Sequence, residues 1–87
     1  MTQTEWFLLA RYQGLPIIPV DRVIADFFPT LGKAVFLRKI LDGSIKLPVV
    51  RMEASQKGAK GIYLSDLARY IDGRHEEATR DFQRMHG

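Results

Sequence analysis

A proline at position 29 divides two amphipathic segments, and this arrangement restricts the chain to a small set of folds. Residues 20–28 carry an apolar stripe at helical spacing, and Pro29 ends that helix. Residues 31–41 predict a second helix, with Thr30 as its N-cap and Gly43 in a left-handed conformation after its end. Two helices joined by so short a turn are typical of a helix-turn-helix, although an ordinary helical hairpin fits the same pattern.

The segment after the second helix favours the winged form of this motif. Residues 47–53 alternate and are rich in β-branched side chains, and residues 62–64 return as a second strand. The loop between them, residues 54–61, is polar and contains glycines and two lysines. A β-hairpin with a basic tip directly after the second helix predicts an α+β winged helix-turn-helix fold.

The two ends of the chain complete this expectation. Residues 4–12 alternate with apolar side chains on both faces and predict an N-terminal strand, with a short helix as the alternative. Residues 17–19 are expected to stay extended because residues before a proline avoid the helical region. A third helix is expected to begin at Ser65 as its cap, and Gly73 is expected to kink or divide it.

The positive charge of this small chain is concentrated in its middle third. The 87 residues carry a net charge of +3, yet from Lys33 to Lys60 there are seven basic residues against Asp42 and Glu53. Such a cluster by itself is more typical of a solvated charged face, and a nucleic-acid surface is the alternative that the helix-turn-helix and hairpin support. The candidate DNA-binding residues, on the second helix, its cap and the hairpin, are Thr30, Lys33, Arg38, Lys39, Arg51, Gln56, Lys57 and Lys60.

The C-terminal helix carries an apolar stripe that continues beyond what a small domain can cover. Its members are spaced four and three residues apart, as in a coiled-coil seam. The candidate dimerisation residues are Ile71, His75, Ala78, Phe82 and Met85. We therefore divide the chain into a DNA-binding domain, residues 1–72, and a helical extension, residues 73–87. The extension either pairs with a second copy or folds back onto its own domain.

Several function classes are excluded by what the chain lacks. It has no cysteine, and neither His75 nor His86 has a partner at metal-ligand spacing, so we expect no catalytic residues, no metal site and no cofactor. No apolar run approaches the ~20 residues of a membrane span, and the start does not resemble a signal peptide. We expect a cytoplasmic, nucleoid-associated binding protein that is not an enzyme and has no membrane partner.

Several motifs together resemble the pyocin activator protein family (PrtN) across almost the whole chain. They are FLLARY at residues 7–12, IPV at 18–20, LPVVR at 47–51, SQK at 55–57 and LARYID at 67–72. The resemblance implies a small DNA-binding transcriptional activator that switches on phage-tail-like bacteriocin genes or prophage genes. Double-stranded DNA is therefore the expected partner, and RNA polymerase is a further candidate partner. The homodimer is expected from the apolar stripe of the C-terminal helix. The order of elements is more loosely similar to excisionase and MerR-type DNA-binding domains.

Two alternatives from other functional classes remain open at this point. An excisionase-like architectural protein would bend DNA without recruiting polymerase. An antirepressor-type module would bind another protein and would show no salt-dependent affinity for DNA.

Overall fold

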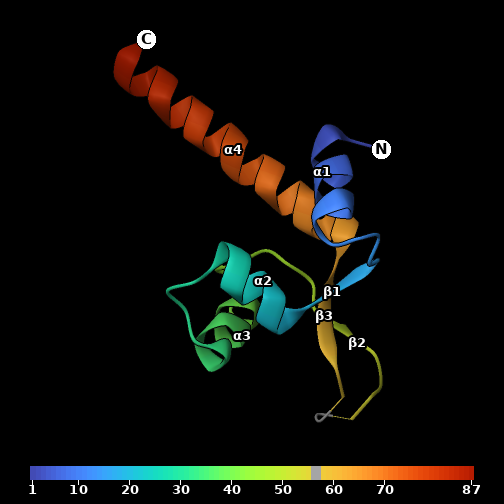
Figure 1. Cartoon of the computed structure of the whole chain (residues 1–87). Helices are drawn as coiled ribbons and strands as arrows, with labels where there is room; N and C mark the ends of the chain where they lie inside the picture. The colour runs from blue at the N-terminus through green and yellow to red at the C-terminus, as the bar shows by residue number, and fades with distance from the viewer. Residues whose placement is uncertain (56–57) are drawn as a thin grey trace.

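Four helices surround a small sheet in the computed structural model, which describes residues 1–55 and 58–87 (Figure 1). In chain order the elements are α1 (Gln3–Arg11), β1 (Ile17–Pro19), α2 (Val20–Phe27), α3 (Lys33–Leu41), β2 (Val50–Arg51), β3 (Lys60–Tyr63) and α4 (Leu64–His86). The order helix, turn, helix, hairpin, helix confirms the predicted α+β winged-helix fold. Its N-terminal element differs from the prediction.

The N-terminal segment is the helix α1, so the predicted strand over residues 4–12 is wrong. A capping box begins the helix: the Thr2 hydroxyl accepts a hydrogen bond from the Glu5 N–H, and the Glu5 carboxylate accepts one from the Thr2 N–H. Leu8 and Tyr12, four residues apart, are buried on one face, while Trp6 and Phe7 face solvent. The alternation that predicted a strand arises because apolar side chains occupy both the buried and the exposed face.

The sheet has three short antiparallel strands in the order β1-β3-β2. The hairpin is confirmed, but its first strand is only Val50–Arg51 where residues 47–53 were predicted. We call β2, β3 and the loop that joins them the wing. Because β3 also pairs with β1, which leads directly into α2, the sheet fixes the wing beside the start of that helix.

Gly61 lies in β3 between the two outer strands and is paired with both of them. It is paired with Pro19 on one side and Val50 on the other. A Cβ atom there would lie 2.9 Å from the Ile18 carbonyl oxygen and would overlap the Ile17 side chain.

We therefore expect Gly61→Ala to lower the free energy of unfolding by about 1–3 kcal/mol through strain. Gly73→Ala is the matched control, because Gly73 lies within α4 with nothing within 4 Å of its added Cβ. Alanine is the better helix former, so this control should raise stability by about 0.5–1 kcal/mol. Urea unfolding of both variants checks the prediction, and an unchanged Gly61→Ala midpoint would contradict it.

The two helices of the helix-turn-helix begin and end close to their predicted limits. The first ends at Phe27 and the second begins at Lys33, so residues 28–32 form the turn. The predicted Thr30 cap is wrong: Gly32 is the N-cap residue of α3 and makes no side-chain cap hydrogen bond. Gly43 follows the end of α3 with a φ of +86°, which confirms the predicted left-handed residue.

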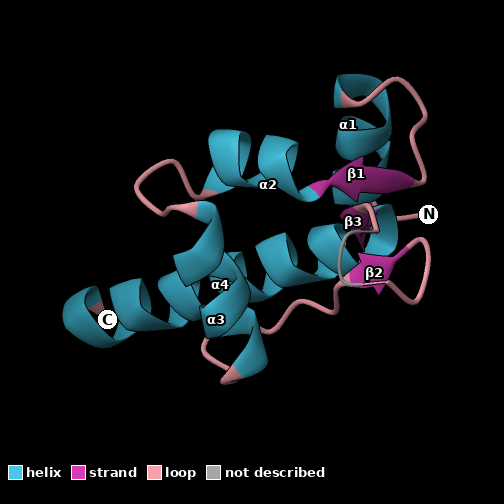
Figure 2. Cartoon of the chain, turned by 90° about the horizontal axis from the view of Figure 1, so that it is seen from below, coloured by secondary structure: helices cyan, strands magenta, loops and turns pink. Residues whose placement is uncertain are grey.

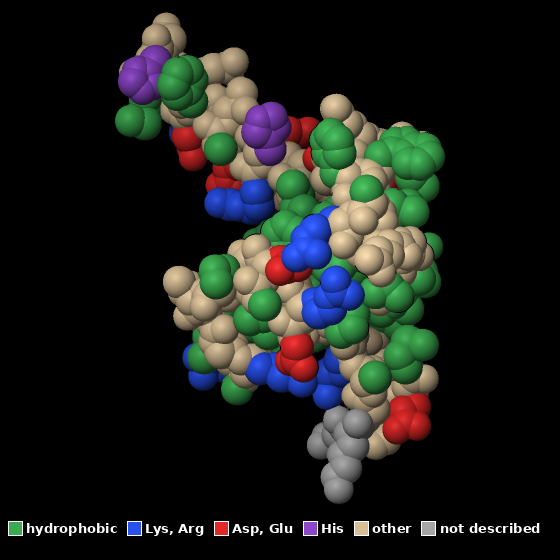
Figure 3. All heavy atoms as spheres, viewed as in Figure 1, with side chains coloured by type: hydrophobic (Ala, Val, Ile, Leu, Met, Phe, Trp, Pro, Cys, Tyr) green, Lys and Arg blue, Asp and Glu red, His purple; other side chains and the backbone are tan. Residues whose placement is uncertain are grey.

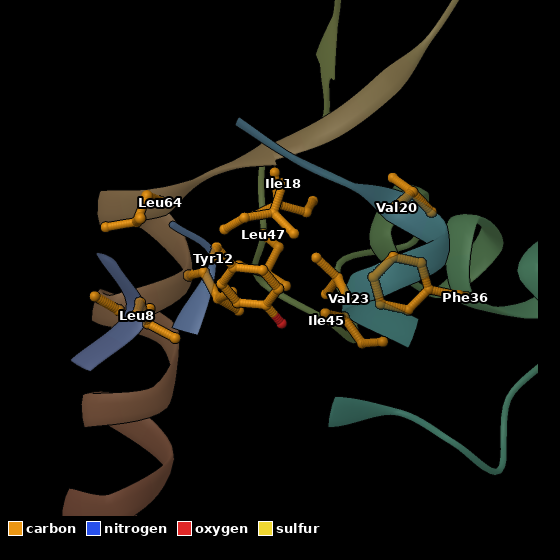
Figure 4. Packing of buried hydrophobic residues seen from close by; sticks show 12 residues of the cluster. Leu8, Tyr12, Ile18, Val20, Val23, Phe36, Ile45, Leu47 and Leu64 are labelled. Carbon is orange, nitrogen blue, oxygen red and sulfur yellow. The ribbon is translucent and has the colours of Figure 1, made fainter. Parts of the chain in front are cut away.

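One apolar core lies where α1, α2, α3, the sheet and the first turns of α4 meet (Figure 4). Phe36 of α3 is fully buried and its ring lies 5.0 Å from that of Phe28, which in turn lies 5.9 Å from that of Tyr70 on α4. The buried residues are Leu8, Tyr12, Ile18, Val20, Val23, Phe36, Ile45, Leu47, Ile62, Leu64, Leu67 and Ala68.

A polar contact joins α1 to α2 at the edge of this core. The Tyr12 hydroxyl donates a hydrogen bond to the Asp26 carboxylate, and the Arg11 guanidinium lies 3.3 Å from the same carboxylate. Burial, together with the neighbouring carboxylate, raises the pKa of Tyr12 to about 12. The phenol therefore stays protonated and keeps donating at any physiological pH.

The last helix is continuous from Leu64 to His86, so the predicted kink or break at Gly73 is wrong. Ser65 is not its cap: Tyr63 is the N-cap residue, and the Ser65 hydroxyl donates to Glu5 of α1 at 3.0 Å. This bond and the bond from the Thr2 N–H, which is the stronger influence, hold the pKa of Glu5 below its ordinary value. Residues 64–72 pack on the body, whereas residues 73–87 are all exposed and project away from it (Figure 1).

Candidate nucleic-acid interface

The wing and α3 lie on the same side of the molecule, opposite the projecting end of α4. Figure 2, which looks at the molecule from below, shows α3 and the hairpin together on this side. In the space-filling view, Lys and Arg side chains gather along the same lower edge, with acidic side chains beside them (Figure 3). This side is therefore the candidate surface for a polyanion.

A shallow hollow of about 240 Å³ joins the start of α3 to the wing. Lys33, the first residue of α3, and Lys60, the first residue of β3, both line it, together with Asp21 in the first turn of α2. Lys33 Nζ lies 3.5 Å from Asp21 Oδ1, and the side chains of both residues are exposed. Such an exposed ion pair contributes little stability, so a phosphate can compete for the lysine.

Arg51 extends the positive charge of this hollow across the sheet. It is the direct Cα partner of Lys60 in the β2–β3 pairing. Directly opposed residues of an antiparallel pair point to the same face, with Cβ atoms about 5 Å apart. The pairing thus places two cations on one face of the wing.

The exposed face of α3 runs from Lys33 to Arg38. At about 100° per residue, Lys33 and Arg38 are about 140° apart around α3. The residues between them are Ala34, the exposed Leu41 and the partly buried Leu37. Lys39 lies outside this face. It is only half-exposed, and its carbonyl oxygen accepts a hydrogen bond from the Ile45 N–H in the connection to β2. The structure therefore brings Lys33 and Arg38 onto one surface and leaves Lys39 at its side.

The apolar spacing of residues 36, 37, 40 and 41 predicts that Leu41 lies on the buried side of α3, and this prediction is wrong. Its side chain is 89% exposed at the end of α3, on the same face as Arg38. Apolar side chains in a DNA groove contact the thymine methyl group. Leu41 is a candidate contact that pattern analysis missed, because its spacing also fits the apolar stripe.

The remaining candidates are placed as follows. Thr30 is exposed in the turn between α2 and α3, with no cap hydrogen bond to the first turn of α3. Gln56 and Lys57 lie outside the described residues.

Metal sites and membrane-spanning helices are not found in the described part of the chain. In residues 1–55 and 58–87 there is no group of three His, Cys, Asp or Glu side chains that could hold a metal ion. Among the helices of the same residues, none is both long and apolar enough to cross a membrane.

Comparison with known proteins identifies the family. The sequence model of the family described as pyocin activator protein PrtN matches residues 4–78. The chain belongs to the PrtN family. The match covers α1, the sheet, α2, α3 and the body-packed part of α4, and it ends before Phe82 and Met85. The comparisons with curated proteins and with solved structures found no match.

Membership of the PrtN family decides between broad classes of function. The family description names an activator protein of pyocin. The chain is therefore a member of a family of transcriptional regulators.

Proposed function

We propose that this PrtN-family chain binds double-stranded DNA through α3 and the wing, and so activates transcription of phage-tail-like bacteriocin or prophage genes. The observation that carries the proposal is the hollow shared by Lys33 and Lys60, with Arg51 opposite Lys60. This hollow lies between the start of α3 and the wing and carries basic side chains, so the phosphate backbone of one DNA strand can lie in it. Contacts to phosphates position a protein on the duplex.

In this proposal α3 enters the major groove beside that phosphate contact. Its N-terminus has no side-chain cap, which leaves the first-turn N–H groups open to a phosphate oxygen. Arg38 then contacts a base edge, guanine being the commonest partner of arginine. Arg51 and the wing residues Gln56, Lys57 and Lys60 contact the flanking backbone or the minor groove, with Thr30 near a phosphate and Lys39 at the side.

Arg38→Ala is expected to weaken binding to the preferred site by about 5- to 150-fold and binding to random DNA by much less. The physical reason is that a base contact distinguishes sequences, whereas a phosphate contact does not. Arg80→Ala is the matched control, since Arg80 is exposed on the part of α4 that projects away from the body (Figure 1). Fluorescence anisotropy on both DNAs measures the effect, and an equal loss on the two would reassign Arg38 to the backbone.

One experiment tests the proposed function as a whole. The purified chain is mixed with fragmented genomic DNA, and the retained fragments are sequenced. Enrichment of a common site upstream of phage-tail or prophage genes supports the proposal. Tandem, cooperative sites without activation in a purified transcription system would indicate an architectural DNA-bending protein. No salt-dependent retention would indicate an antirepressor-type protein-binding module.

We infer further that the chain acts as a homodimer and that α4 forms part of the interface. Its stripe of Ile71, His75, Ala78, Phe82 and Met85 ends in large apolar side chains that the body does not cover. RNA polymerase is the further partner that activation requires.

A further inference from the structure

Two apolar helix faces of this chain are left uncovered. On the free part of α4, Phe82 is 62% exposed and Met85 is 78% exposed. On α1, Trp6 is 61% exposed and Phe7 is 64% exposed. Figure 3 shows hydrophobic side chains on both helices on the side of the molecule that faces the viewer. Exposed apolar groups at regular helical spacing mark an interaction surface.

The free part of α4 is too small to hold two copies together alone. Its two large side chains offer about 600 Å² between two copies, which is within the size of accidental crystal contacts. Adding the two aromatic side chains of α1 brings the total to about 1,200 Å², above the ~1,000 Å² at which specific interfaces begin. A stable pair therefore needs both faces.

The charges beside the stripe favour an antiparallel arrangement of two α4 helices. Arg74 and Asp81 are seven residues, or two turns, apart and so lie on the same flank of α4. In an antiparallel pair the same flanks meet, so each Arg74 faces the partner's Asp81. In a parallel pair opposite flanks meet, and Arg74 would face the partner's Thr79 instead. Because opposite charges beside the seam attract each other, they favour the antiparallel orientation of the two α4 helices.

Arg74 and Asp81 each make an ion pair within α4, and these pairs leave both residues able to contact a partner helix. Arg74 binds Glu77 at 2.8 Å, and Asp81 binds Arg84. Both are exposed pairs three residues apart along one helix, which hold their partners weakly.

The same pairing fixes which apolar residues meet. When Arg74 lies beside the partner's Asp81, Ile71 lies opposite the partner's Phe82, and His75 lies opposite the partner's Ala78. The partner's Met85 then falls level with Ala68, which is buried under α1. The N-terminal turn of α1 is held at this level of α4, because the Thr4 hydroxyl donates to Asp72 at 2.6 Å. Met85 therefore meets α1 rather than α4.

From this we propose that two copies of the chain pair through antiparallel α4 helices, and that the end of each α4 lies on the Trp6 and Phe7 face of the partner's α1. The inference gives a geometry to the homodimer of the proposed function and does not depend on DNA binding. It is tested without DNA, so its failure leaves the DNA-binding proposal standing.

Cysteine crosslinking tests the orientation, because the chain has no native cysteine. Ile71→Cys combined with Phe82→Cys should form a disulfide between chains under mild oxidation. Within one chain these positions are about 16 Å apart along the helix, and a disulfide needs Cα atoms within about 7 Å. Each single variant is a matched control: in the proposed register its two cysteines are also about 16 Å apart, so it should stay uncrosslinked. A parallel pair would crosslink Phe82→Cys alone and would overturn the proposal.

A second pair of sites removes any risk from folding, since Ile71 is partly buried. Arg74→Asp, at an exposed position, places like charges opposite each other and should weaken the dimer, and adding Asp81→Arg should restore it. Sedimentation equilibrium of the unmodified chain should show a dimer, and Phe82→Asp should show a monomer that keeps its helical circular dichroism. A monomeric unmodified chain overturns the proposal.

The single tryptophan reports on the α1 half of the interface. Trp6 emission should shift to shorter wavelength as the concentration of the chain rises, because dimerisation moves the indole out of water. Met85→Glu should remove this shift while Arg80→Ala, on the opposite side of α4, keeps it. Crosslinking without any shift in Trp6 emission would overturn the placement of the helix end on α1.

Discussion

Phe36→Ala is expected to lower the free energy of unfolding by about 3–5 kcal/mol. The side chain is fully buried and packs α3 against the core. Its ring lies against that of Phe28, which in turn lies against the ring of Tyr70 on α4. Removing the ring leaves a cavity between α2 and α3. Two short helices can close such a cavity only by changing the angle at which they pack against each other. In a domain of this size the loss corresponds to a fall in Tm of roughly 15 °C or more.

Thermal and urea unfolding followed by circular dichroism measure this loss. Leu41→Ala is the matched control, an apolar-to-alanine change on the same helix at a side chain that is 89% exposed. It should alter stability by no more than about 0.5 kcal/mol. Equal losses for the two variants would show that α3 does not pack through Phe36.

Lys33→Ala combined with Lys60→Ala is expected to weaken binding to all duplex sequences by roughly 30-fold at physiological salt. Both side chains line the hollow between α3 and the wing, where one DNA strand is proposed to lie. Each lost phosphate contact lowers the slope of log affinity against log salt by about 0.9, so the double variant should lose roughly 2.

The measurement is a salt titration of DNA affinity by fluorescence anisotropy. Arg69→Ala combined with Arg80→Ala removes the same charge from exposed positions on α4 and should leave the slope nearly unchanged. If the two double variants behave alike, binding follows net charge and the hollow is not the contact. Thermal unfolding of the lysine variant should match that of the unchanged chain.

How far the sequence predicts this molecule depends on how local each feature is. The turn at Pro29 and the left-handed Gly43 follow from one or two residues, and the structure confirms them. The wing was predicted from a change in periodicity after α3, which is also local. The resemblance carried by the LPVVR and LARYID segments is confirmed by the family match.

The N-terminal helix shows where periodicity is insufficient. Apolar side chains on both sides of residues 4–12 satisfy the strand period and the helix period equally. The capping box of Thr2 and Glu5 decides for helix, and it lies just before the apolar run. A search for caps ahead of such a run would have found it.

The geometry of the candidate site could not be predicted from the sequence, because it depends on the tertiary structure. Lys33 and Lys60 are distant in sequence and meet only because β3 pairs with the strand that leads into α2. The exposure of Leu41 likewise depends on α3 ending at the edge of the core. Spacing alone placed it with Phe36 and Ile40 on one stripe.

The unbroken course of α4 through Gly73 makes it a rigid rod shared by the body and its free end. In the antiparallel pair, Ala68 of each copy lies level with the partner's Met85, so the middles of the two body-packed segments are about 25 Å apart along the helix axis. One turn of DNA spans about 34 Å, so the number of residues in the rod works as a gauge for the distance between half-sites. A residue inserted after Gly73 would both lengthen this gauge and turn one body by about 100° against the other. Operator spacing would then be written into the length of a helix that touches no DNA.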